Sequence, residues 1–239
     1  MTDNIYNPEY VKRLFNGMSS SYERMNYITS FGFSIRWRTE ILKPFQKDNH
    51  KIEVIDLLTG MGETWNSIKY KFPNANISAL DFSSEMLKNA ERKNEDHFKN
   101  EVNLIQQDIL QSKLPSNHFD FVICSFGLKT FNTEQLEKLA SETKRILKAD
   151  GQFSFVEVSK PENTILKGFY QFYLSQVIPI IGRLLLGNPT EYKMLWRYID
   201  KFENAKLASE IFRNVGLKTE YRSYFYGCAT GFIGQKPEK

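Results

Sequence analysis

The sequence predicts a doubly wound α/β fold, with a mostly parallel seven-stranded sheet that ends in an antiparallel hairpin. From Lys51 onward, short apolar runs alternate with helical patterns, which is the order of a parallel sheet covered by helices. The first run passes into a helix through a glycine-rich turn, Thr59-Gly60-Met61-Gly62. A length of 239 residues with 41% hydrophobic content suits one domain with additions.

The chain divides into four expected regions. They are an N-terminal helical extension (1–45), a core (46–160), a helical insert (161–204) and a C-terminal helix with a hairpin (205–239). The core strands are expected at 51–58, 76–81, 102–108, 119–125 and 152–158, as continuous apolar runs covered on both faces. Helices are expected at 63–71, from 83 to about 92, and at 133–147, the last closed by Asp150-Gly151. The last region predicts a helix at 205–215 and strands at 218–226 and 230–235.

The insert contains an aromatic and apolar stretch from Ile165 to Leu186. Polar residues and a proline interrupt it, so it falls short of the roughly 20 predominantly apolar residues that a membrane-spanning helix needs. We interpret it as an amphipathic segment. Such a segment could form a lid over an apolar acceptor, bind to a membrane surface, or be a core or dimer helix, and the sequence does not distinguish these roles.

Composition excludes several classes of protein. The net charge of +4 is spread along the chain instead of being gathered in a basic stripe, so no nucleic-acid partner is expected. Cys124 and Cys228 lie far apart and form no ligand pattern, so neither a disulfide nor a metal site is expected. The N-terminus lacks the features of a signal peptide, which favours a cytoplasmic location.

The glycine turn predicts a nucleoside-binding site. Gly60 and Gly62 follow a strand and open a helix, and Asp81 ends the next strand about 20 residues later. This layout lets the backbone approach a ligand while a carboxylate binds a ribose diol. Trp65 stands where a dinucleotide site would need a third glycine beneath the pyrophosphate. An S-adenosylmethionine site has no pyrophosphate and tolerates this tryptophan, although a plain turn between strand and helix is the simpler alternative.

Other cofactor-binding candidates follow the carboxyl ends of the strands, where open α/β sheets bind ligands. Asp108 could accept a hydrogen bond from the adenine amino group, with Met86 and Ile109 as apolar walls, but it could equally be an ordinary helix cap. The complete set predicted from this region is Leu58, Thr59, Gly60, Gly62, Asp81, Phe82, Met86, Asp108, Ile109 and Ser125.

Several segments together resemble the C-methyltransferases of ubiquinone and menaquinone biosynthesis, from about Tyr10 to the C-terminus. They are Phe15 with Tyr22-Glu23-Arg24-Met25-Asn26, Ser30-Phe31-Gly32 with Trp37-Arg38, the glycine turn with Asp81, Ser125-Phe126-Gly127-Leu128, Val156-Glu157-Val158-Ser159-Lys160-Pro161, and Tyr173 with Val177-Ile178-Pro179. The resemblance implies a Rossmann-like class I methyltransferase fold that uses S-adenosylmethionine and releases S-adenosylhomocysteine. It also implies methylation of a ring carbon of a prenylated hydroquinone, with Tyr22 and Met25 closing the site over the cofactor.

One departure from the family pattern concerns the acceptor. Lys129-Thr130 stands where the family usually has Arg-Asn, and a lysine does not reproduce the fork of an arginine. A methyltransferase of the same fold that acts on another phenol, carbon or amine of a natural product therefore stays an alternative. A nucleic-acid methyltransferase is a weaker alternative, because the sequence has no Asn-Pro-Pro-Tyr motif. A non-catalytic binding protein is also weaker, because the cofactor turn is present.

Methyl transfer to a ring carbon needs an ionised neighbouring phenol, and hence a base or a held water near the methyl group. The histidines fall in predicted loops or helix ends, so they are poor candidates. Lys129, Glu157, Tyr22 and Tyr173 are the better ones. Their simpler alternatives are a solvated loop charge for Lys129, an ion pair for Glu157 and an aromatic core or lid for Tyr173. The expected partner is a small apolar aromatic acceptor, while peripheral membrane contact and a homodimer stay open.

Overall fold

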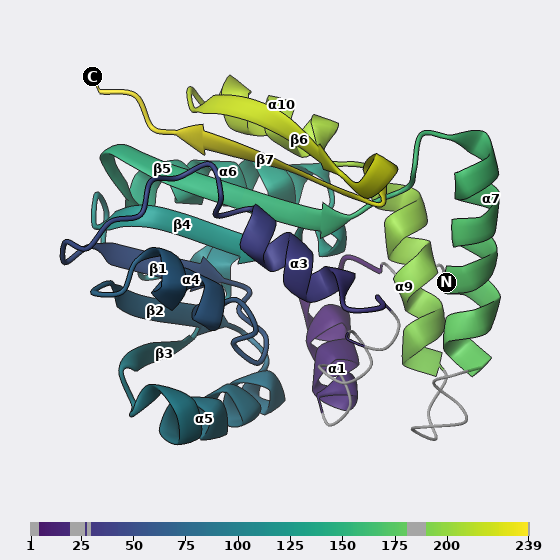
Figure 1. The fold of residues 1–239 in the computed structure, drawn as a ribbon, viewed down its shortest axis with the longest axis horizontal. Helices are drawn as coiled ribbons and strands as arrows, with labels where there is room; N and C mark the ends of the chain where they lie inside the picture. Colours follow the sequence, from purple (N-terminus) through teal and green to yellow (C-terminus); the bar gives the residue numbers. More distant parts are fainter. Residues whose placement is uncertain (1–4, 20–26, 28–29, 181–189, 239) are drawn as a thin grey trace.

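The computed structural model describes residues 5–19, 27, 30–180 and 190–238. Within these residues, seven strands form one sheet in the order β3-β2-β1-β4-β5-β7-β6 (Figure 1). The strands are β1 (Glu53–Leu57), β2 (Asn76–Asp81), β3 (Val102–Gln106), β4 (Phe119–Ser125), β5 (Leu147–Val158), β6 (Lys218–Tyr224) and β7 (Ala229–Gln235). The first five pair in parallel, whereas β7 runs antiparallel to β5 and β6. The predicted fold class is therefore confirmed.

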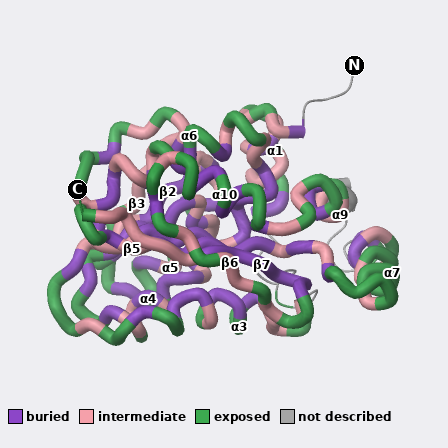
Figure 2. Tube along the Cα trace, turned by 90° about the horizontal axis from the view of Figure 1, so that it is seen from above, coloured by how far each residue is buried: buried purple, intermediate pink, exposed green. Residues whose placement is uncertain are grey.

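Helices cover both faces of the sheet. On one face lie α3 (Phe33–Glu40), α4 (Trp65–Lys71) and α5 (Ser84–Phe98), and on the other α6 (Thr133–Ile146) and α10 (Lys206–Asn214). Each face has its own core, with Trp65 and Phe72 in one cluster and Leu139 and Phe212 in the other. Figure 2 shows the buried strands between these layers.

Further helices lie around the end toward which the β5 arrow points (Figure 1). They are α1 (Pro8–Met18), α7 (Thr164–Phe172), its π-helical continuation η3 (Tyr173–Val177) and α9 (Thr190–Phe202). Met18, Leu174, Ile178 and Ile199 join them in a small cluster of their own. No helix in the described ranges combines the length and apolarity needed to cross a bilayer.

The predicted start of the fifth core strand, at residue 152, is wrong. The turn Asp150-Gly151 was expected to close a helix, but it lies inside β5, which begins at Leu147. Asp150 has φ 58° and donates its N–H to the Lys236 carbonyl, so the turn is a register irregularity in a paired strand. A local turn pattern cannot distinguish these two cases, because the deciding partner, β7, lies more than 80 residues away.

Other ends differ by a few residues. The helix expected to end near residue 92 continues as α5 to Phe98, because Asn94 and Phe98 are buried and Lys99 at φ 53° ends it. β3 ends at Gln106, since Asp108 begins the 3₁₀ turn η1 (Ile109–Gln111). β6 ends at Tyr224, where the 3₁₀ turn η4 (Phe225–Gly227) follows.

Candidate active site

The glycine turn after β1 is shaped by left-handed backbone and by packing. Gly60 has φ 58°, and its N–H donates to Asp81 Oδ2 at 2.9 Å, which joins the ends of β1 and β2. Gly62 has φ 78°, and a Cβ there would lie 2.6 Å from the ring of Trp65. Gly62 does not line the pocket described below, so the structure places it against Trp65 instead of in the predicted cofactor-binding wall.

Trp65 and Thr59 form a buried hydrogen-bonded chain beneath this turn. The fully buried Trp65 donates from Nε1 to Thr59 Oγ1 at 2.9 Å, and Thr59 donates from Oγ1 to Asp56 Oδ2 at 2.6 Å. Burial raises the pKa of Asp56 to about 7. The tryptophan that argues against a dinucleotide site is thus part of the support of the turn.

Asp81 lies at the end of β2 and is 6% exposed. Its Oδ1 accepts from the Ser83 N–H at 2.9 Å, and its Oδ2 accepts from Gly60. Burial raises its pKa to about 6, while these backbone donors act in the opposite direction. The carboxylate is therefore held in a fixed orientation at the wall of a pocket, as a ribose-binding group must be.

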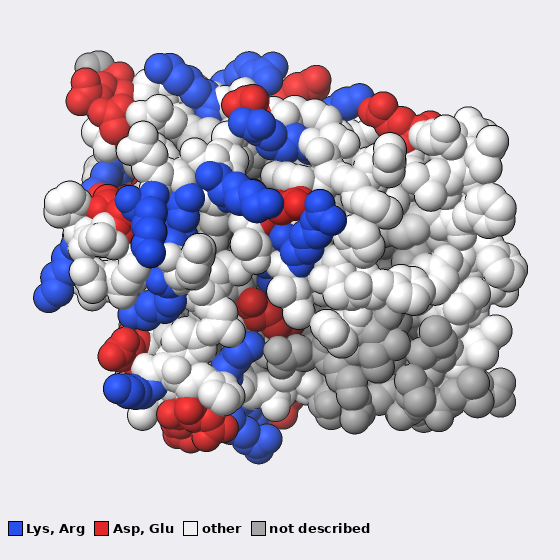
Figure 3. Space-filling view, viewed as in Figure 1, with Lys and Arg blue, Asp and Glu red and all other residues white. Residues whose placement is uncertain are grey.

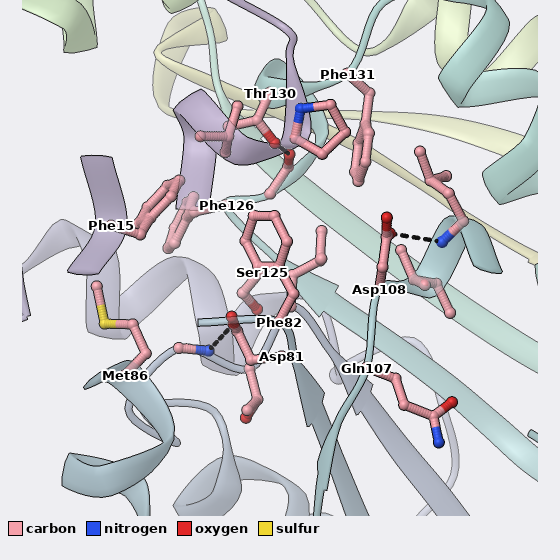
Figure 4. Close-up of a pocket in the computed structure, with 18 of the residues that line it drawn as sticks. Phe15, Asp81, Phe82, Met86, Gln107, Asp108, Ser125, Phe126, Thr130 and Phe131 are labelled. Carbon is pink, nitrogen blue, oxygen red and sulfur yellow. Dashed lines mark hydrogen bonds between the residues drawn. The ribbon is translucent and has the colours of Figure 1, made fainter. Parts of the chain in front are cut away.

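This first pocket encloses about 810 Å³, open solvent included, at the carboxyl ends of the strands (Figure 4). The structure brings most of the predicted cofactor-binding residues together in its wall: Leu58, Thr59, Gly60, Asp81, Phe82, Met86, Asp108, Ile109 and Ser125. Asp108 also accepts from the Leu110 N–H at 2.9 Å, so it does cap a turn, and this cap lies at the pocket. Tyr22 and Met25 lie outside the described residues.

Sequence reasoning missed several residues of this pocket. Tyr6, Pro8, Val11 and Phe15 line it from α1 and the residues before it. Arg38 from α3 is 5% exposed, stacks its guanidinium 4.7 Å from the centroid of the Phe126 ring and lies 3.6 Å from Glu63 Oε1. The only sequence signal for Arg38 was the Trp37-Arg38 pair noted in the resemblance.

Glu63 adds a half-buried carboxylate to the wall of the first pocket. Its Oε2 accepts from the Met61 N–H at 3.2 Å, whereas its buried Oε1 has no hydrogen-bond partner among the described residues. The Arg38 guanidinium, 3.6 Å away, gives this atom an ion pair but no hydrogen bond, so Oε1 can still accept from a ligand that brings a donor.

A second, larger pocket adjoins the first and is mostly apolar. It encloses about 1440 Å³, again with open solvent included, between α1, α3, α7, η3 and η4. The two pockets share Phe15, Phe126 and Thr130. Tyr173 lines the second pocket from the π-helical turn, and burial raises its pKa. Phe126 adopts φ 68° at this junction, and a Cβ on the following Gly127 would clash with the Leu58 side chain, so the chain turns tightly between the pockets.

Lys129 and Glu157 form a buried ion pair beside this junction. Lys129 Nζ donates to Glu157 Oε1 and to the Phe126 carbonyl, each at 2.9 Å. Glu157 also accepts from the N–H groups of Lys129 and Val158, at 3.1 and 2.7 Å. Lys129 is 6% exposed and lines the second pocket, so it is not a solvated loop charge, whereas Glu157 is fully buried behind it.

The histidines lie away from both pockets. His50 pairs with Asp48, His118 lies 3.8 Å from Glu53 at the start of β1, and His97 lies in the last turn of α5. In the described part of the chain, no group of His, Cys, Asp and Glu residues is suited to hold a metal ion.

Comparison with known proteins identifies the family. The sequence model of the ubiE/COQ5 methyltransferase family matches residues 3–236. The chain belongs to this family. It is 29% identical over 235 residues to a demethylmenaquinone methyltransferase of Lactococcus lactis, covering 98% of this chain and 92% of that protein. A protein of the same name from Geobacillus stearothermophilus is 29% identical over 230 residues, covering 95% and 97%.

Solved structures agree on the fold. A putative S-adenosylmethionine-dependent methyltransferase of Methanococcus maripaludis aligns with a TM-score of 0.64 at 19% identity, covering 95% of this chain and 94% of that one. A phosphoethanolamine N-methyltransferase of Haemonchus contortus, in complex with S-adenosylhomocysteine, aligns with a TM-score of 0.61 at 16% identity, covering 90% and 59%. The chain is an S-adenosylmethionine-dependent methyltransferase, as the sequence predicted.

Proposed function

We propose that this enzyme transfers the methyl group of S-adenosylmethionine to a ring carbon of a prenylated hydroquinone. The observation that carries the proposal is the junction of two unlike pockets at Phe126 and Thr130. One pocket presents carboxylates and backbone N–H groups at the strand ends, and the other is large and apolar. The demethylmenaquinone methyltransferases that share 29% identity with the chain support the same acceptor class.

The residues of the first pocket fit the cofactor. Asp81 would accept from the ribose hydroxyls, and Met86 and Ile109 would flank the adenine. The amino-acid end of the cofactor carries an ammonium and a carboxylate, and the pocket offers Glu63 Oε1, which lacks a donor, and the Arg38 guanidinium. When bound, the cofactor supplies an electrophilic methyl group on a sulfonium.

Lys129 would bind the acceptor oxygen. Two of its three ammonium protons go to Phe126 and Glu157, and the third has no partner among the described residues. An ammonium paired with a buried carboxylate is a poor base but a good donor to a phenolate. The acceptor would react as its phenolate, after the phenol proton has gone to water. The phenolate electron pair would move into the ring and the adjacent carbon would bond the methyl group, while the C–S bond breaks with its electron pair on sulfur. Loss of the ring proton to water would then restore the aromatic ring.

Exclusion of water and alignment of the acceptor are the remaining tasks, and an in-line displacement requires both. Phe15 from α1 and Phe126 stand at the junction, where they would separate the reacting atoms from solvent. Tyr173 would bound the ring from the side of the insert. No covalent intermediate on the protein is needed.

The test is a transfer assay with methyl-labelled S-adenosylmethionine. Short-chain demethylmenaquinol, kept reduced, is compared with simple phenols, catechols and aromatic amines. We expect label on the quinol ring carbon, identified by mass spectrometry of the re-oxidised product. Methylation of another phenol or amine, with none of the quinol, would contradict the proposal. It would favour the second candidate, a natural-product methyltransferase, which Lys129-Thr130 in place of Arg-Asn supports.

A further inference from the structure

Helix α3 and the turn before it bring polar groups to one corner of the second pocket. Ser30, Ser34 and Trp37 line that pocket, and their spacing of four and three residues places them along one side of this segment. Most of the other lining residues are Leu, Ile, Val, Met, Phe and Tyr. The α3 corner, as we call these three residues, is therefore a polar spot in an apolar cavity.

Two hydrogen-bond donors of the α3 corner have no acceptor among the described residues. Trp37 is 5% exposed, and its buried Nε1 has no partner. Ser34 is 7% exposed, and its Oγ accepts from Ser30 Oγ at 2.9 Å, while its own hydroxyl proton meets no acceptor in the described part of the chain. Because buried polar groups are nearly always hydrogen-bonded, two such donors one helical turn apart suit a ligand atom that accepts.

The surroundings hold the α3 corner in place. The Ser34 N–H donates to Ser30 Oγ at 3.1 Å, so the Ser30 side chain is fixed by both the backbone and the hydroxyl of Ser34. The Trp37 ring packs against Phe33 and Phe126, with ring centroids 5.7 and 6.3 Å apart. Donors that are already oriented lose little freedom when a ligand binds, so they select for an oxygen at one place.

Phe126 connects the α3 corner to Lys129. Its ring packs against Trp37, and its carbonyl accepts from Lys129 Nζ at 2.9 Å. The two polar spots are thus separated by a single phenylalanine residue in the wall of one pocket. On the face seen in Figure 3, no charged side chain lies over α7, which forms another wall of this pocket. A ligand with oxygens on opposite sides of one aromatic ring matches this arrangement.

We propose that Ser34 and Trp37 bind the second ring oxygen of the acceptor, the one para to the oxygen that Lys129 binds. This assignment rests on the proposed function, and it names the residues that select a hydroquinone over a simple phenol. The para oxygen would accept from the Ser34 hydroxyl and from the Trp37 indole N–H, while the reacting carbon stays beside the oxygen on Lys129. The pair serves binding and orientation alone, because no proton or electron pair passes through it.

The first test compares two acceptors. Short-chain demethylmenaquinol has both oxygens, whereas 3-prenyl-1-naphthol keeps the oxygen beside the reacting carbon and lacks the para oxygen. The variants are Ser34→Ala and Trp37→Phe. Their matched control is Ser209→Ala on α10, which removes a buried hydroxyl that has no partner among the described residues and lines neither pocket.

We expect Ser34→Ala and Trp37→Phe each to raise the KM for the quinol about fivefold, through loss of one hydrogen bond, and to leave kcat near its wild-type value. The KM for the naphthol should not change, because that acceptor has no oxygen at the α3 corner. The control should keep both wild-type KM values. All variants should bind S-adenosylmethionine as the wild type does in calorimetry, since none of the three residues lines the first pocket.

A second measurement needs no turnover. The chain has three tryptophans, and Trp37→Phe identifies the Trp37 indole signal in the NMR spectrum of nitrogen-15-labelled protein. With S-adenosylhomocysteine present, 2,3-dimethyl-1,4-naphthoquinone is added; its control is 2,3-dimethylnaphthalene, which has the same rings and no oxygen. The quinone should move the indole proton signal downfield, as a new hydrogen bond does, whereas the hydrocarbon should cause only a ring-current shift.

Either measurement can overturn the inference. Equal KM changes for the quinol and the naphthol in Ser34→Ala, or no change for either, would show that the para oxygen is not bound at the α3 corner. An indole signal that responds alike to the quinone and the hydrocarbon would show the same for Trp37. If the wild type methylates neither acceptor, the proposed function fails, and the indole signal alone then decides whether this corner binds a ring oxygen.

Discussion

The buried pair of Lys129 and Glu157 allows a prediction of definite size. In Glu157→Gln the carboxylate is replaced by a neutral amide of nearly the same shape, so the buried ammonium keeps only neutral acceptors. Glu157 is fully buried and accepts three hydrogen bonds, and Lys129 is 6% exposed, so water cannot replace the lost charge. Removal of one partner of such a pair costs about 3–5 kcal/mol.

That cost is a large share of the stability of an ordinary domain, which is about 5–15 kcal/mol. For a chain of this size the urea dependence lies near the upper end of the usual range, about 3 kcal/mol per molar. The urea midpoint of Glu157→Gln should therefore fall by about 1–2 M. Lys129→Met/Glu157→Gln, which has no buried charge left to compensate, should recover most of the loss.

Activity measurements separate the structural role of Lys129, in the buried ion pair, from its proposed role in catalysis. The double variant should bind S-adenosylmethionine as the wild type does, because neither residue lines the first pocket. If Lys129 binds the acceptor oxygen, the refolded double variant should nevertheless transfer methyl groups at least about a hundredfold more slowly, as loss of one oxyanion donor does in other enzymes. Full activity of the double variant would refute the role in catalysis. A midpoint of Glu157→Gln within 0.3 M (roughly 1 kcal/mol) of the wild type would refute the burial argument.

Three further predictions concern the cofactor turn. Asp81→Ala should weaken S-adenosylmethionine binding by about 1.5–3 kcal/mol in calorimetry, because it removes a charged acceptor; unchanged affinity would mean that the ribose lies elsewhere. Burial raises the pKa of Asp81 to about 6, from an ordinary value of 3.8, so the folded chain holds this proton more tightly than the unfolded chain does. Between pH 4 and 7 this group should therefore lower the unfolding free energy as pH rises, by about 2–3 kcal/mol in total, while cofactor affinity should fall as pH drops through 6. Asp81→Asn should reduce the pH slope in urea unfolding by the share of Asp81, leaving that of Asp56, and should remove the pH dependence of cofactor affinity in calorimetry; an identical pH slope in unfolding would count against the assignment. Gly62→Ala should destabilise the chain by about 2–4 kcal/mol in thermal unfolding, because residue 62 has a positive φ and the added Cβ would clash with Trp65. The control Gly168→Ala on α7 should be neutral or stabilising, because a Cβ added there meets no atom within 4 Å.

The parallel core was predictable because its signals are local. A continuous apolar run fixes a strand that is covered on both faces, and the carboxyl ends of such strands meet at one edge of the sheet. Asp81, Asp108 and Ser125 could therefore be assigned to one site without any knowledge of distances. The bounds of β2 and β4 agree with the predicted ranges for the same reason.

The rest of the site depends on contacts between distant parts of the chain. Arg38 reaches the pocket because α3 packs on the sheet through Trp37 and Ile41, which no local pattern near Arg38 reveals. For Lys129, a solvated loop charge was the simpler alternative to a catalytic role, because charged loop residues usually lie in solvent. Its burial follows from Glu157, 28 residues further along the chain, and only the pairing of β4 with β5 brings the two together.

The glycine turn illustrates how a departure from a motif can be compensated. Thr59 directly precedes the first glycine of the turn, and Trp65 stands where a dinucleotide site has its third glycine. In the structure the two residues depend on each other, because Thr59 Oγ1 accepts from Trp65 Nε1 and donates to Asp56. A glycine at residue 59 would leave the buried indole N–H and one carboxyl oxygen of Asp56 without partners, and a smaller residue at 65 would leave a cavity beneath the turn. The threonine and the tryptophan therefore act as a unit that holds the backbone of Gly60 against Asp81, which is the contact that fixes the carboxylate of the proposed ribose site.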